Sequence, residues 1–577
     1  MYGRASVPSA GRLGLLDGSA AADLAALGWS NEKSIDVLWS LSRAPDADLA
    51  LRALIRMHDA VGAEWAEIDA EIRTNKAFRG RLFGVLGSSD AIGDHLVAET
   101  SSWRRLLSDE LPDRDELFRQ MLASVGAQPE PEEVAKGNLV YRAAITGPKS
   151  VVALRIAYRN LLLELAAHDV ASTVEDEPVM WFPNVGAYLA DLADAALTGA
   201  LAVAYREVFG DKPITVRLAV IAMGKCGARE LNYVSDVDVV FVSEPADGKS
   251  ARIAGEMMRV GTLAFFEVDA ALRPEGKAGA LTRTLESHLA YYKRWAKTWE
   301  FQALLKARPM TGDMGLAREY YDAVNPMVWH AAERDDFVPE VQAMRRRVES
   351  LVPEELRDRN LKLGSGSLRD VEFAVQLLQM VHGRVDEKLR VQATVDALAA
   401  LTAGGYVGRD DGANLSASYQ FLRLLEHRLQ LQKLSRTHLL PAFDDEPNMR
   451  WLARAAHIRR QGDKSATEVL RAEIRHQSLR IRRLHEKLFY RPLLESVIHF
   501  NADELTLSSA AAQRRLAALG YAKPDRALSH IRALASGAGR RGQIQLLILP
   551  QLLELIGRTP DPDAGLLNYR NLCDELV

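Results

Sequence analysis

Two aspartates separated by one residue, Asp236 and Asp238, follow Ser235 at the start of a β-branched apolar run. Residues two apart in a strand point to the same face, so the two carboxylates would lie side by side. Two adjacent negative charges repel each other, and a hard divalent cation with oxygen ligands, above all Mg²⁺, relieves that cost. The pair therefore predicts a magnesium site, although Asp-x-Asp alone also occurs on exposed strands without function.

A glycine–lysine turn, Gly224-Lys225, precedes the aspartates and directly follows another apolar run. Glycine lets backbone amides approach phosphate oxygens closely, and Lys225 would add a point charge to the same phosphates. Asn232 and Ser235 are further candidates for contacting phosphate or for orienting the carboxylates. A carboxylate pair with a phosphate-binding turn predicts metal-assisted chemistry on a nucleotide or another phosphate ester.

The elements that must position these residues are short strands within a mostly helical chain. Apolar β-branched runs at 213–223, 237–242 and 263–268 predict three strands. Helical spacing is found at 37–61 with a break at 44–48, at 151–167, at 185–208, and from about 335 to the end. The fold class is therefore expected to be mainly α with an embedded small mixed β-sheet.

Length and composition indicate a soluble protein with several domains. The chain has 577 residues, for which two to four domains are expected, and its hydrophobic and charged contents, 48% and 26%, are ordinary. Its net charge of −4 gives no sign of a nucleic-acid partner. Cys226 and Cys573 are too few for a disulfide framework, which indicates the cytoplasm. No signal peptide is visible, and Pro550 and Glu554 interrupt the apolar stretch 543–556, so a core helix is expected there and no membrane span.

The Gly-Lys turn, Glu-Leu-Asn at 230–232 and Ser-Asp-x-Asp together resemble the DNA polymerase β-like nucleotidyltransferase superfamily. More narrowly, they resemble the glutamine synthetase adenylyltransferase/adenylyl-removing enzyme family. Later segments resemble motifs of that family in the same order: 268–277 (Val-Asp-Ala-Ala-Leu-Arg-Pro-Glu-Gly-Lys), 298–308 (Thr-Trp-Glu-Phe-Gln-Ala-Leu-Leu-Lys-Ala-Arg), 366–373 (Gly-Ser-Leu-Arg-Asp-Val-Glu-Phe), 425–430 (Leu-Glu-His-Arg-Leu-Gln) and 437–441 (Thr-His-Leu-Leu-Pro).

The resemblance implies a third metal-binding carboxylate on a later strand. Asp269 is the natural candidate, with Glu267, two residues earlier, as the fallback; the alternative role for Asp269 is to cap the turn that follows it. Arg273 and Lys277 are expected to hold phosphate. Ala271 stands where the family has the first arginine of Arg-Leu-Arg-Pro, which leaves Arg273 as the expected substrate contact.

Other noticeable residues have alternative explanations. Asp370 and Glu372 open a helix, where residues i and i+2 diverge by about 200°, so they cannot clamp one metal. Their charges either complement the helix dipole or have a role at the rim of the active site. Cys226 is expected to pack rather than to act as a nucleophile, and Glu230 to pair with Arg229 or Lys225. The basic run at 423–491 predicts a solvated helical face, with a polyanion-binding face as the alternative.

In function, the resemblance implies an enzyme that removes AMP from an adenylylated tyrosine of glutamine synthetase. Mg²⁺ would be the cofactor, phosphate and ADP the small molecules, and glutamine synthetase and a PII-type nitrogen-signalling protein the partners. The Gly-Lys and Glu-Leu-Asn variants resemble the adenylyl-removing unit of the family. Attachment of AMP from ATP, a non-catalytic interaction module and a nucleic-acid polymerase are the alternatives.

The expected segments follow from this resemblance. They are an N-terminal helical region (1–135), a nucleotidyltransferase core with inserted helices (136–325), a helical bundle (326–502) and a helical linker to a second catalytic unit (503–577). The chain is accordingly expected to be an N-terminal fragment.

Overall fold

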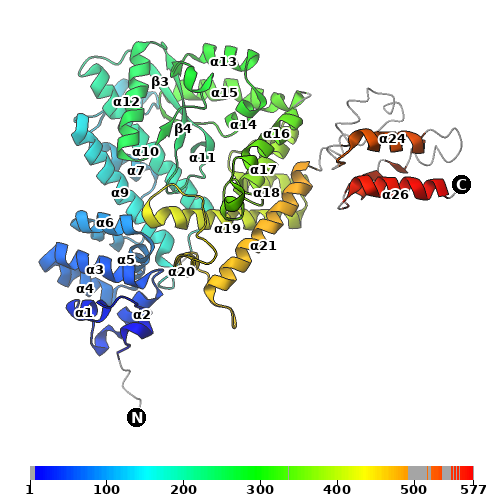
Figure 1. Ribbon diagram of the computed structural model, residues 1–577. Coiled ribbons are helices and arrows are strands. Elements are labelled where there is room, and N and C mark those ends of the chain that lie inside the picture. Colours follow the sequence, from blue (N-terminus) through cyan, green and yellow to red (C-terminus); the bar gives the residue numbers. More distant parts are fainter. Residues whose placement is uncertain are drawn as a thin grey trace. The chain divides into compact units, whose positions relative to one another are not determined.

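A computed structural model describes residues 7–490, except 178, 335 and 336, and parts of the remaining chain, chiefly 521–535 and 561–575. The chain divides into two compact units, Met1–Ile481 and Arg482–Val577, and each is described by itself. Helices dominate the described residues and a small sheet is embedded among them, which confirms the predicted mainly α architecture (Figure 1). The finer division into four segments stays a prediction.

The first unit begins with a helical region, in blue in Figure 1, which contains the expected break between two helices. Helix α2 ends at Arg43 and α3 begins at Ala47, after the Asp46 side chain accepts a 2.9 Å hydrogen bond from the Leu49 amide. The helices of this region are α1 (Ala20–Ala26), α2 (Ile35–Arg43), α3 (Ala47–Val61), α4 (Trp65–Thr74), α5 (Lys76–Ser88), α6 (Asp90–Ala98) and α7 (Arg114–Ser124).

Two long apolar helices, α9 (Gly147–Ala171) and α10 (Phe182–Phe209), follow as the sequence predicts. By length and composition, α10 alone among the described helices is apolar enough to cross a membrane. Its apolar window is 83% buried within the protein, and residues of α10 belong to the same core cluster as residues of α9. In this structure α10 is a core helix.

The sheet has the strand order β5–β4–β3–β7, with β6 also paired to β4. Strand β3 pairs antiparallel with β4 and β7, whereas β4 pairs parallel with β5 and β6. In Figure 1 the sheet lies between α12 on one side and α13 and α15 on the other. The strands are β3 (Arg217–Ala222), β4 (Val237–Glu244), β5 (Val268–Asp269), β6 (Thr282–Arg283) and β7 (Arg308–Gly312), and the helices are α12 (Gly248–Ala264), α13 (Leu285–Arg294), α14 (Thr298–Leu304) and α15 (Met314–His330).

The first two predicted strands are confirmed as β3 and β4, but the third was predicted too early in the chain. Helix α12 continues to Ala264, and β5 comprises only Val268–Asp269. The apolar side chains before β5 serve packing instead, because Phe265 and Phe266 contact the Tyr158 ring at centroid distances of 5.1 and 5.9 Å. The two-residue strand β6 is too short to produce a detectable period in sequence.

Helices return after the sheet and pack beside it in the same compact unit. Helix α17 begins at Leu368, directly after the glycine–serine turn at 364–367, so Asp370 and Glu372 open a helix as predicted. The basic run does not form a purely solvated face, because Arg423 and Arg428 on α19 are buried in ion pairs with Glu426 and Asp169. The helices are α16 (Phe337–Ser350), α17 (Leu368–His382), α18 (Thr394–Ala403), α19 (Arg409–Lys433), α20 (Glu446–Ala455) and α21 (Ala466–His485).

In the second unit the described helices are α24 (Pro524–Ala535) and α26 (Pro562–Glu575). Buried residues of both helices, among them Ile531 and Leu566, share one small hydrophobic core. The predicted change of segment near 500–506 lies outside the described residues, and so does most of the apolar stretch 543–556.

Candidate active site

The turn between β3 and β4 holds the predicted glycine directly against the predicted carboxylate. The Met223 amide donates a 2.8 Å hydrogen bond to the Asp238 carbonyl, which closes the hairpin beside the turn. Gly224 has a φ of +54°, and a Cβ at this position would lie 2.5 Å from Asp238 Oδ2. Both the backbone conformation and the missing side chain are therefore required here. Glycine makes room for the carboxylate as well as for any ligand.

Three aspartates gather at one end of the sheet. Asp238 and Asp269 are direct partners in the parallel pairing of β4 with β5, and Asp236 lies two residues before Asp238. Burial raises the pKa of Asp238 to about 6, and the negative charges of Asp236 and Asp269 contribute to the rise. A cation at this point would remove that repulsion.

The carboxylates do not form a preassembled cage. Asp269 Oδ1 accepts a 2.7 Å hydrogen bond from the Ala271 amide, and Asp236 Oδ2 lies 3.0 Å from the Arg436 guanidinium. Within the part of the chain that the structure describes, no three His, Cys, Asp or Glu side chains converge closely enough to hold a metal ion alone. The role of Asp269 as a third ligand thus stays a prediction.

Lys225 points into a network that the sequence did not indicate. Its Nζ lies 3.4 Å from Asn232 Oδ1 and 3.4 Å from the carboxylate of Glu426 on α19. Glu426 is fully buried and also pairs with Arg423 at 3.0 Å and with His438 at 2.9 Å. Desolvation lowers the pKa of Lys225 to about 7 despite the opposing effect of Glu426. Lys225 is thus held in place by α19, one of the helices α16–α21 that follow the sheet and are called the helical segment below.

Helix α19 also anchors the loop that leads to Asp236. Gln430 Oε1 accepts a 3.1 Å hydrogen bond from the Val234 amide. Asp169 accepts a 2.8 Å hydrogen bond from the Tyr233 hydroxyl and forms a buried ion pair with Arg428. Glu426 and Gln430 are four residues apart, so they lie on one face of α19 and reach Lys225 and Val234, whereas Arg428 projects from another face to Asp169.

The Glu-Leu-Asn motif has a structural role through its first residue. Glu230 is buried, and its carboxylate pairs with Lys306 at 3.3 Å and accepts a 2.8 Å hydrogen bond from the Thr394 amide. The sequence predicted pairing with Arg229 or Lys225, and that prediction was wrong in its partner. Arg229 instead forms an ion pair of 2.6 Å with Asp191.

A cavity of about 410 Å³ lies against the carboxylate pair and is of a size suited to a nucleotide. Five cationic and three acidic side chains line it, together with apolar surface. Its lining residues are Gly224, Lys225, Ser235, Asp236, Asp238, Leu272, Trp299, Gln302, Ala303, Lys306, Met344, Val348, Lys362, Arg369, Glu372, Phe373, Gln376 and Arg436.

Three of these cations, Lys362, Arg369 and Arg436, come from the helical segment and were not among the sequence candidates. Arg436 pairs with Asp236, and Arg369 Nη1 donates a 2.9 Å hydrogen bond to Glu372. The detectable signal was Arg369 within the 366–373 motif, close to the glycine–serine turn. Lys362 and Arg436 lie outside every recognisable motif.

Three predicted phosphate ligands, Asn232, Arg273 and Lys277, do not line this cavity. Asn232 is buried and contacts Lys225 instead. Arg273 donates to the carbonyls of Ala270, Lys277 and Gly279 at 2.7, 3.0 and 3.1 Å, so its guanidinium is occupied in holding its own loop. Lys277 is exposed on that loop, and neither residue lines the cavity. Of this loop only Leu272 lines the cavity, and the Arg273 side chain is used for the internal structure of the loop.

The ambiguous acidic pair is resolved into two different roles. Asp370 is buried and pairs with Arg345 at 2.6 Å, which ties α17 to α16. Glu372 lines the cavity; although burial acts to raise its pKa, Arg369 and other cations lower that pKa to about 2. Cys226 is buried and its pKa is raised to about 12 by desolvation, as fits a packing role.

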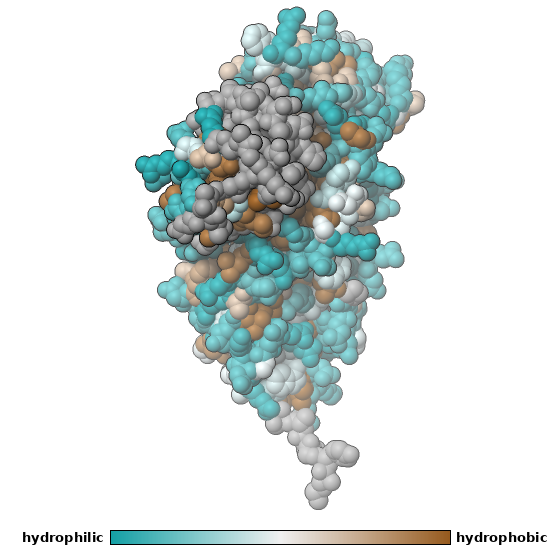
Figure 2. Space-filling view, turned by 90° about the vertical axis from the view of Figure 1, so that its right-hand side faces the viewer, coloured by the Kyte–Doolittle hydropathy of each residue, from teal (hydrophilic) through white to brown (hydrophobic). Residues whose placement is uncertain are grey.

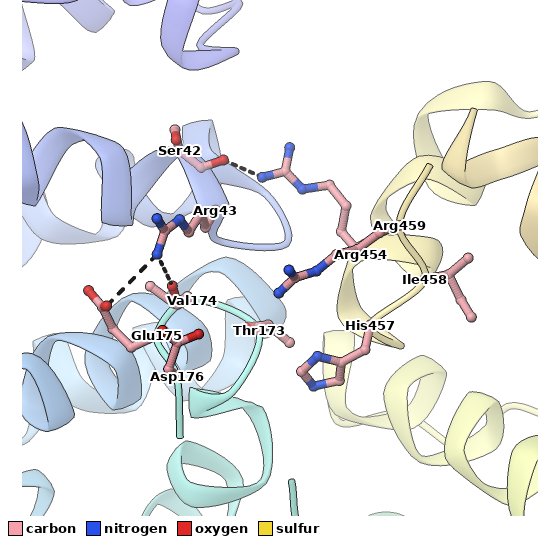
Figure 3. Close-up of a pocket in the computed structure, with 10 residues that line it drawn as sticks. All are labelled: Ser42, Arg43, Thr173, Val174, Glu175, Asp176, Arg454, His457, Ile458 and Arg459. Atoms are coloured by element: carbon pink, nitrogen blue, oxygen red, sulfur yellow. Dashed lines mark hydrogen bonds and ion pairs between the residues drawn. The ribbon is translucent and has the colours of Figure 1, made fainter. Parts of the chain in front are cut away.

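A second cavity of about 430 Å³ is built from other elements, α2, the end of α9 and the segment after α20 (Figure 3). Its Arg454 donates to the Ala44 carbonyl at 2.7 Å, and its His457 hydrogen-bonds Ser172 at 3.0 Å. Arg43 points toward Glu175 and the Val174 carbonyl. Arg454, which is half-buried, thus joins the N-terminal helices to α20, and this cavity is lined by none of the predicted site residues.

Two family models match different parts of this chain. The family model described as glutamate-ammonia ligase adenylyltransferase matches residues 80–322, and that described as GlnD PII-uridylyltransferase matches residues 342–489. The first match contains the sheet and the carboxylates, and the second contains α17 and α19. The two matches therefore supply the two walls of the cavity.

Relatives over the whole chain carry one name, bifunctional glutamine synthetase adenylyltransferase/adenylyl-removing enzyme. Identity is 66% over 573 residues with the protein of Nocardia farcinica, 60% over 583 residues with that of Mycolicibacterium smegmatis, and 55% over 595 residues with that of Corynebacterium glutamicum. The alignments cover 99% of this chain and 57% of each relative, so the chain spans less than two thirds of their length. With this identity along its length, the chain belongs to the glutamine synthetase adenylyltransferase/adenylyl-removing enzyme family.

Proposed function

We propose that this chain removes AMP from an adenylylated tyrosine of glutamine synthetase by metal-dependent phosphorolysis, which gives ADP. The supporting observation is one cavity lined by carboxylates and by cations together. The carboxylates are Asp236 and Asp238, and the cations include Lys362, Arg369 and Arg436. Carboxylates suit a metal ion and the cations suit phosphate groups, so both charge types that a nucleotidyl transfer needs are present. We propose further that the hairpin and its turn form a DNA polymerase β-like core.

The donor atoms fit Mg²⁺. Asp236 and Asp238 line the cavity, and burial together with the charges of Asp236 and Asp269 raises the pKa of Asp238. Magnesium in nucleotide enzymes is commonly held by one or two carboxylates plus substrate phosphates, so a full protein cage is not needed. When bound, the ion would neutralise charge on the transferring phosphoryl group. Asp269 is the proposed third carboxylate.

The proposed reaction conserves atoms and charge. An oxygen of hydrogen phosphate bonds to the phosphorus of the tyrosyl-AMP diester, and the bond between that phosphorus and the tyrosine oxygen breaks. The phenolate takes the proton that the attacking phosphate gives up, so the products are tyrosine and ADP. The residues of the cavity act by positioning and by electrostatic stabilisation, which supply most of the rate acceleration in transfers of this kind. Leu272, Trp299 and Phe373 offer apolar surface to the adenine.

Direction and partners rest on resemblance. The Gly-Lys and Glu-Leu-Asn variants at 224–225 and 230–232 support removal of AMP rather than its attachment. The similarity of 342–489 to a PII-uridylyltransferase supports a PII-type protein as the regulatory partner. Attachment of AMP from ATP is the second candidate, since the relatives are named for both activities.

The test supplies adenylylated glutamine synthetase, Mg²⁺ and phosphate, and measures ADP. A parallel reaction supplies labelled ATP and unmodified glutamine synthetase. We expect phosphate-dependent ADP release in the first reaction and no efficient labelling in the second. Robust labelling from ATP without ADP release would show that the direction is assigned wrongly.

A further inference from the structure

The cations of the cavity differ in how far their charge is already compensated. Lys225 pairs with the fully buried Glu426, and Lys306 pairs with the buried Glu230. Arg436 lies 3.0 Å from Asp236, and its side chain is 47% exposed. These three have protein partners for their charge. They are therefore weaker candidates for binding a free anion.

Lys362 is the exception. Its backbone is hydrogen-bonded on both sides, but its ammonium group has no hydrogen-bond or ion-pair partner among the residues that the structure describes. The Nη1 atom of the neighbouring Arg369 donates a hydrogen bond to Glu372. The Arg369 Nε atom is buried and has no acceptor in the part of the chain that the structure describes. The buried Arg369 Nε is a donor left without an acceptor, which is costly, and the half-buried Lys362 lines the same cavity as Arg369. An anion between them would satisfy both.

The turn that carries these side chains is fixed in place. The Arg369 amide donates a 3.1 Å hydrogen bond to the Lys362 carbonyl, so the two residues are directly joined. Gly366 has a φ of +73°, and a Cβ there would lie 2.2 Å from the Ser478 carbonyl oxygen on α21. Only glycine lets the turn approach α21 this closely. The cations are therefore presented from a rigid support, as a preorganised anion site requires.

We propose that Lys362 and Arg369 bind the inorganic phosphate that attacks the tyrosyl-AMP diester; this inference rests on the function proposed above. The first-turn amides of α17 at Leu368, Arg369 and Asp370 already donate to carbonyls, so the subsite is made by side chains and not by the helix terminus. Glu372 neutralises part of the Arg369 charge, so Lys362 is the dominant contact. Asp236 and Asp238, two of the three carboxylates proposed to bind metal, line the same cavity and would face the diester.

The kinetic test varies inorganic phosphate at saturating adenylylated glutamine synthetase and measures ADP release. Loss of a charge-assisted contact in Lys362→Met should raise the KM for phosphate about tenfold to a hundredfold. The KM for adenylylated glutamine synthetase should stay within about twofold, since a phosphate contact does not touch that substrate. Lys362→Arg should recover most of the phosphate affinity. Lys388→Met, at an exposed lysine after α17, is the matched control and should behave as the original chain.

A binding measurement separates this inference from the proposed function. Phosphorus NMR or calorimetry with inorganic phosphate alone should show binding to the original chain and to Lys388→Met, and little binding to Lys362→Met, with circular dichroism confirming that each variant is folded. Lys362-dependent binding without ADP formation would support the subsite and overturn phosphorolysis. ADP formation with an unchanged KM for phosphate in Lys362→Met would overturn the subsite. A raised KM for the protein substrate alone would also overturn it, because Lys362 would then hold the nucleotide.

Discussion

Replacing Arg428 with methionine would leave the Asp169 carboxylate buried without its cation. In the structure both side chains are almost completely buried, and Arg428 Nη2 donates a 2.8 Å hydrogen bond to Asp169 Oδ1. Burial acts to raise the pKa of Asp169, but the guanidinium holds it below its ordinary value of 3.8. Methionine fills a similar volume without charge, so the change isolates the ion pair.

The loss of unfolding free energy in the variant is set by the response of Asp169 that costs the least free energy. Asp169 can take up a proton in the folded state, and keeping a carboxyl of ordinary pKa 3.8 protonated at pH 7 costs about 4 kcal/mol. This agrees with the roughly 3–5 kcal/mol measured when one partner of a buried pair is removed. The same proton uptake costs only about 2 kcal/mol at pH 5.

The sign of the pH dependence is therefore fixed. In the original chain the pKa of Asp169 is lowered, so its contribution is present above the unfolded pKa and is lost as the pH falls through the folded pKa. In Arg428→Met the pKa is raised and this contribution is gone. The difference in unfolding free energy between the two proteins should shrink as the pH falls from 7 to 5.

Urea unfolding of both proteins at several pH values, followed by tryptophan fluorescence, measures that difference. Arg409→Met, at an exposed arginine on the same helix, is the control and should change stability little. A deficit below about 1 kcal/mol that does not vary with pH would refute the reasoning, because it would mean that the Asp169 charge is already solvated.

Asp236→Asn and Asp238→Asn should each abolish nucleotidyl transfer without reducing the helical circular dichroism signal. Full activity in either variant would contradict the proposed metal site. Asp269→Asn should reduce kcat by several orders of magnitude if it is the third ligand; a loss under about tenfold, 1.4 kcal/mol of barrier, excludes that role. Gly224→Ala should lower activity strongly, since its Cβ would lie 2.5 Å from Asp238 Oδ2, and a normal rate would contradict the geometry. Burial lowers the pKa of His288 to about 4, so stability should fall as the pH drops from about 6.5 to 4; His288→Phe should remove about 3 kcal/mol of that loss in acid unfolding.

The sequence was sufficient for features that depend on local patterns. Strands β3 and β4, the break before α3 and the start of α17 follow from apolar periodicity and turn residues. The carboxylates Asp236 and Asp238 do line one cavity, but β4 begins at Val237, so Asp236 lies one residue before the strand and the shared face on a strand was not found as predicted. The short strand β5 was placed too early, since a helix end and a two-residue strand have no distinct period.

Features that depend on tertiary contacts were not available from the sequence. Nothing local distinguishes Arg423 and Arg428, which are buried, from the exposed arginines of the same run, because their partners Glu426 and Asp169 are set by the packing of α19. Arg273 shows the converse. Its motif suggested a substrate contact, but its guanidinium donates to carbonyls of its own loop.

Where grey atoms do not cover it, the face in Figure 2 is predominantly hydrophilic, with hydrophobic residues scattered among the polar ones. The cavity itself joins residues that lie far apart in the chain. Lys225 and the carboxylates come from the sheet segment, whereas Glu426, Lys362 and Arg369 come from the helical segment.

Neither segment is sufficient for the proposed chemistry. The segment around the sheet contributes the carboxylates proposed to bind a cation, but its Lys225 is paired with Glu426. The helical segment contributes Lys362, whose ammonium group has no partner among the described residues. A displacement of α19 would remove the counter-charge of Lys225 and the anchors at Val234 and Tyr233 together. Under the proposed function, a displacement of α19 is therefore expected to lower the rate of transfer without any contact to a carboxylate, because α19 anchors the loop that leads to Asp236.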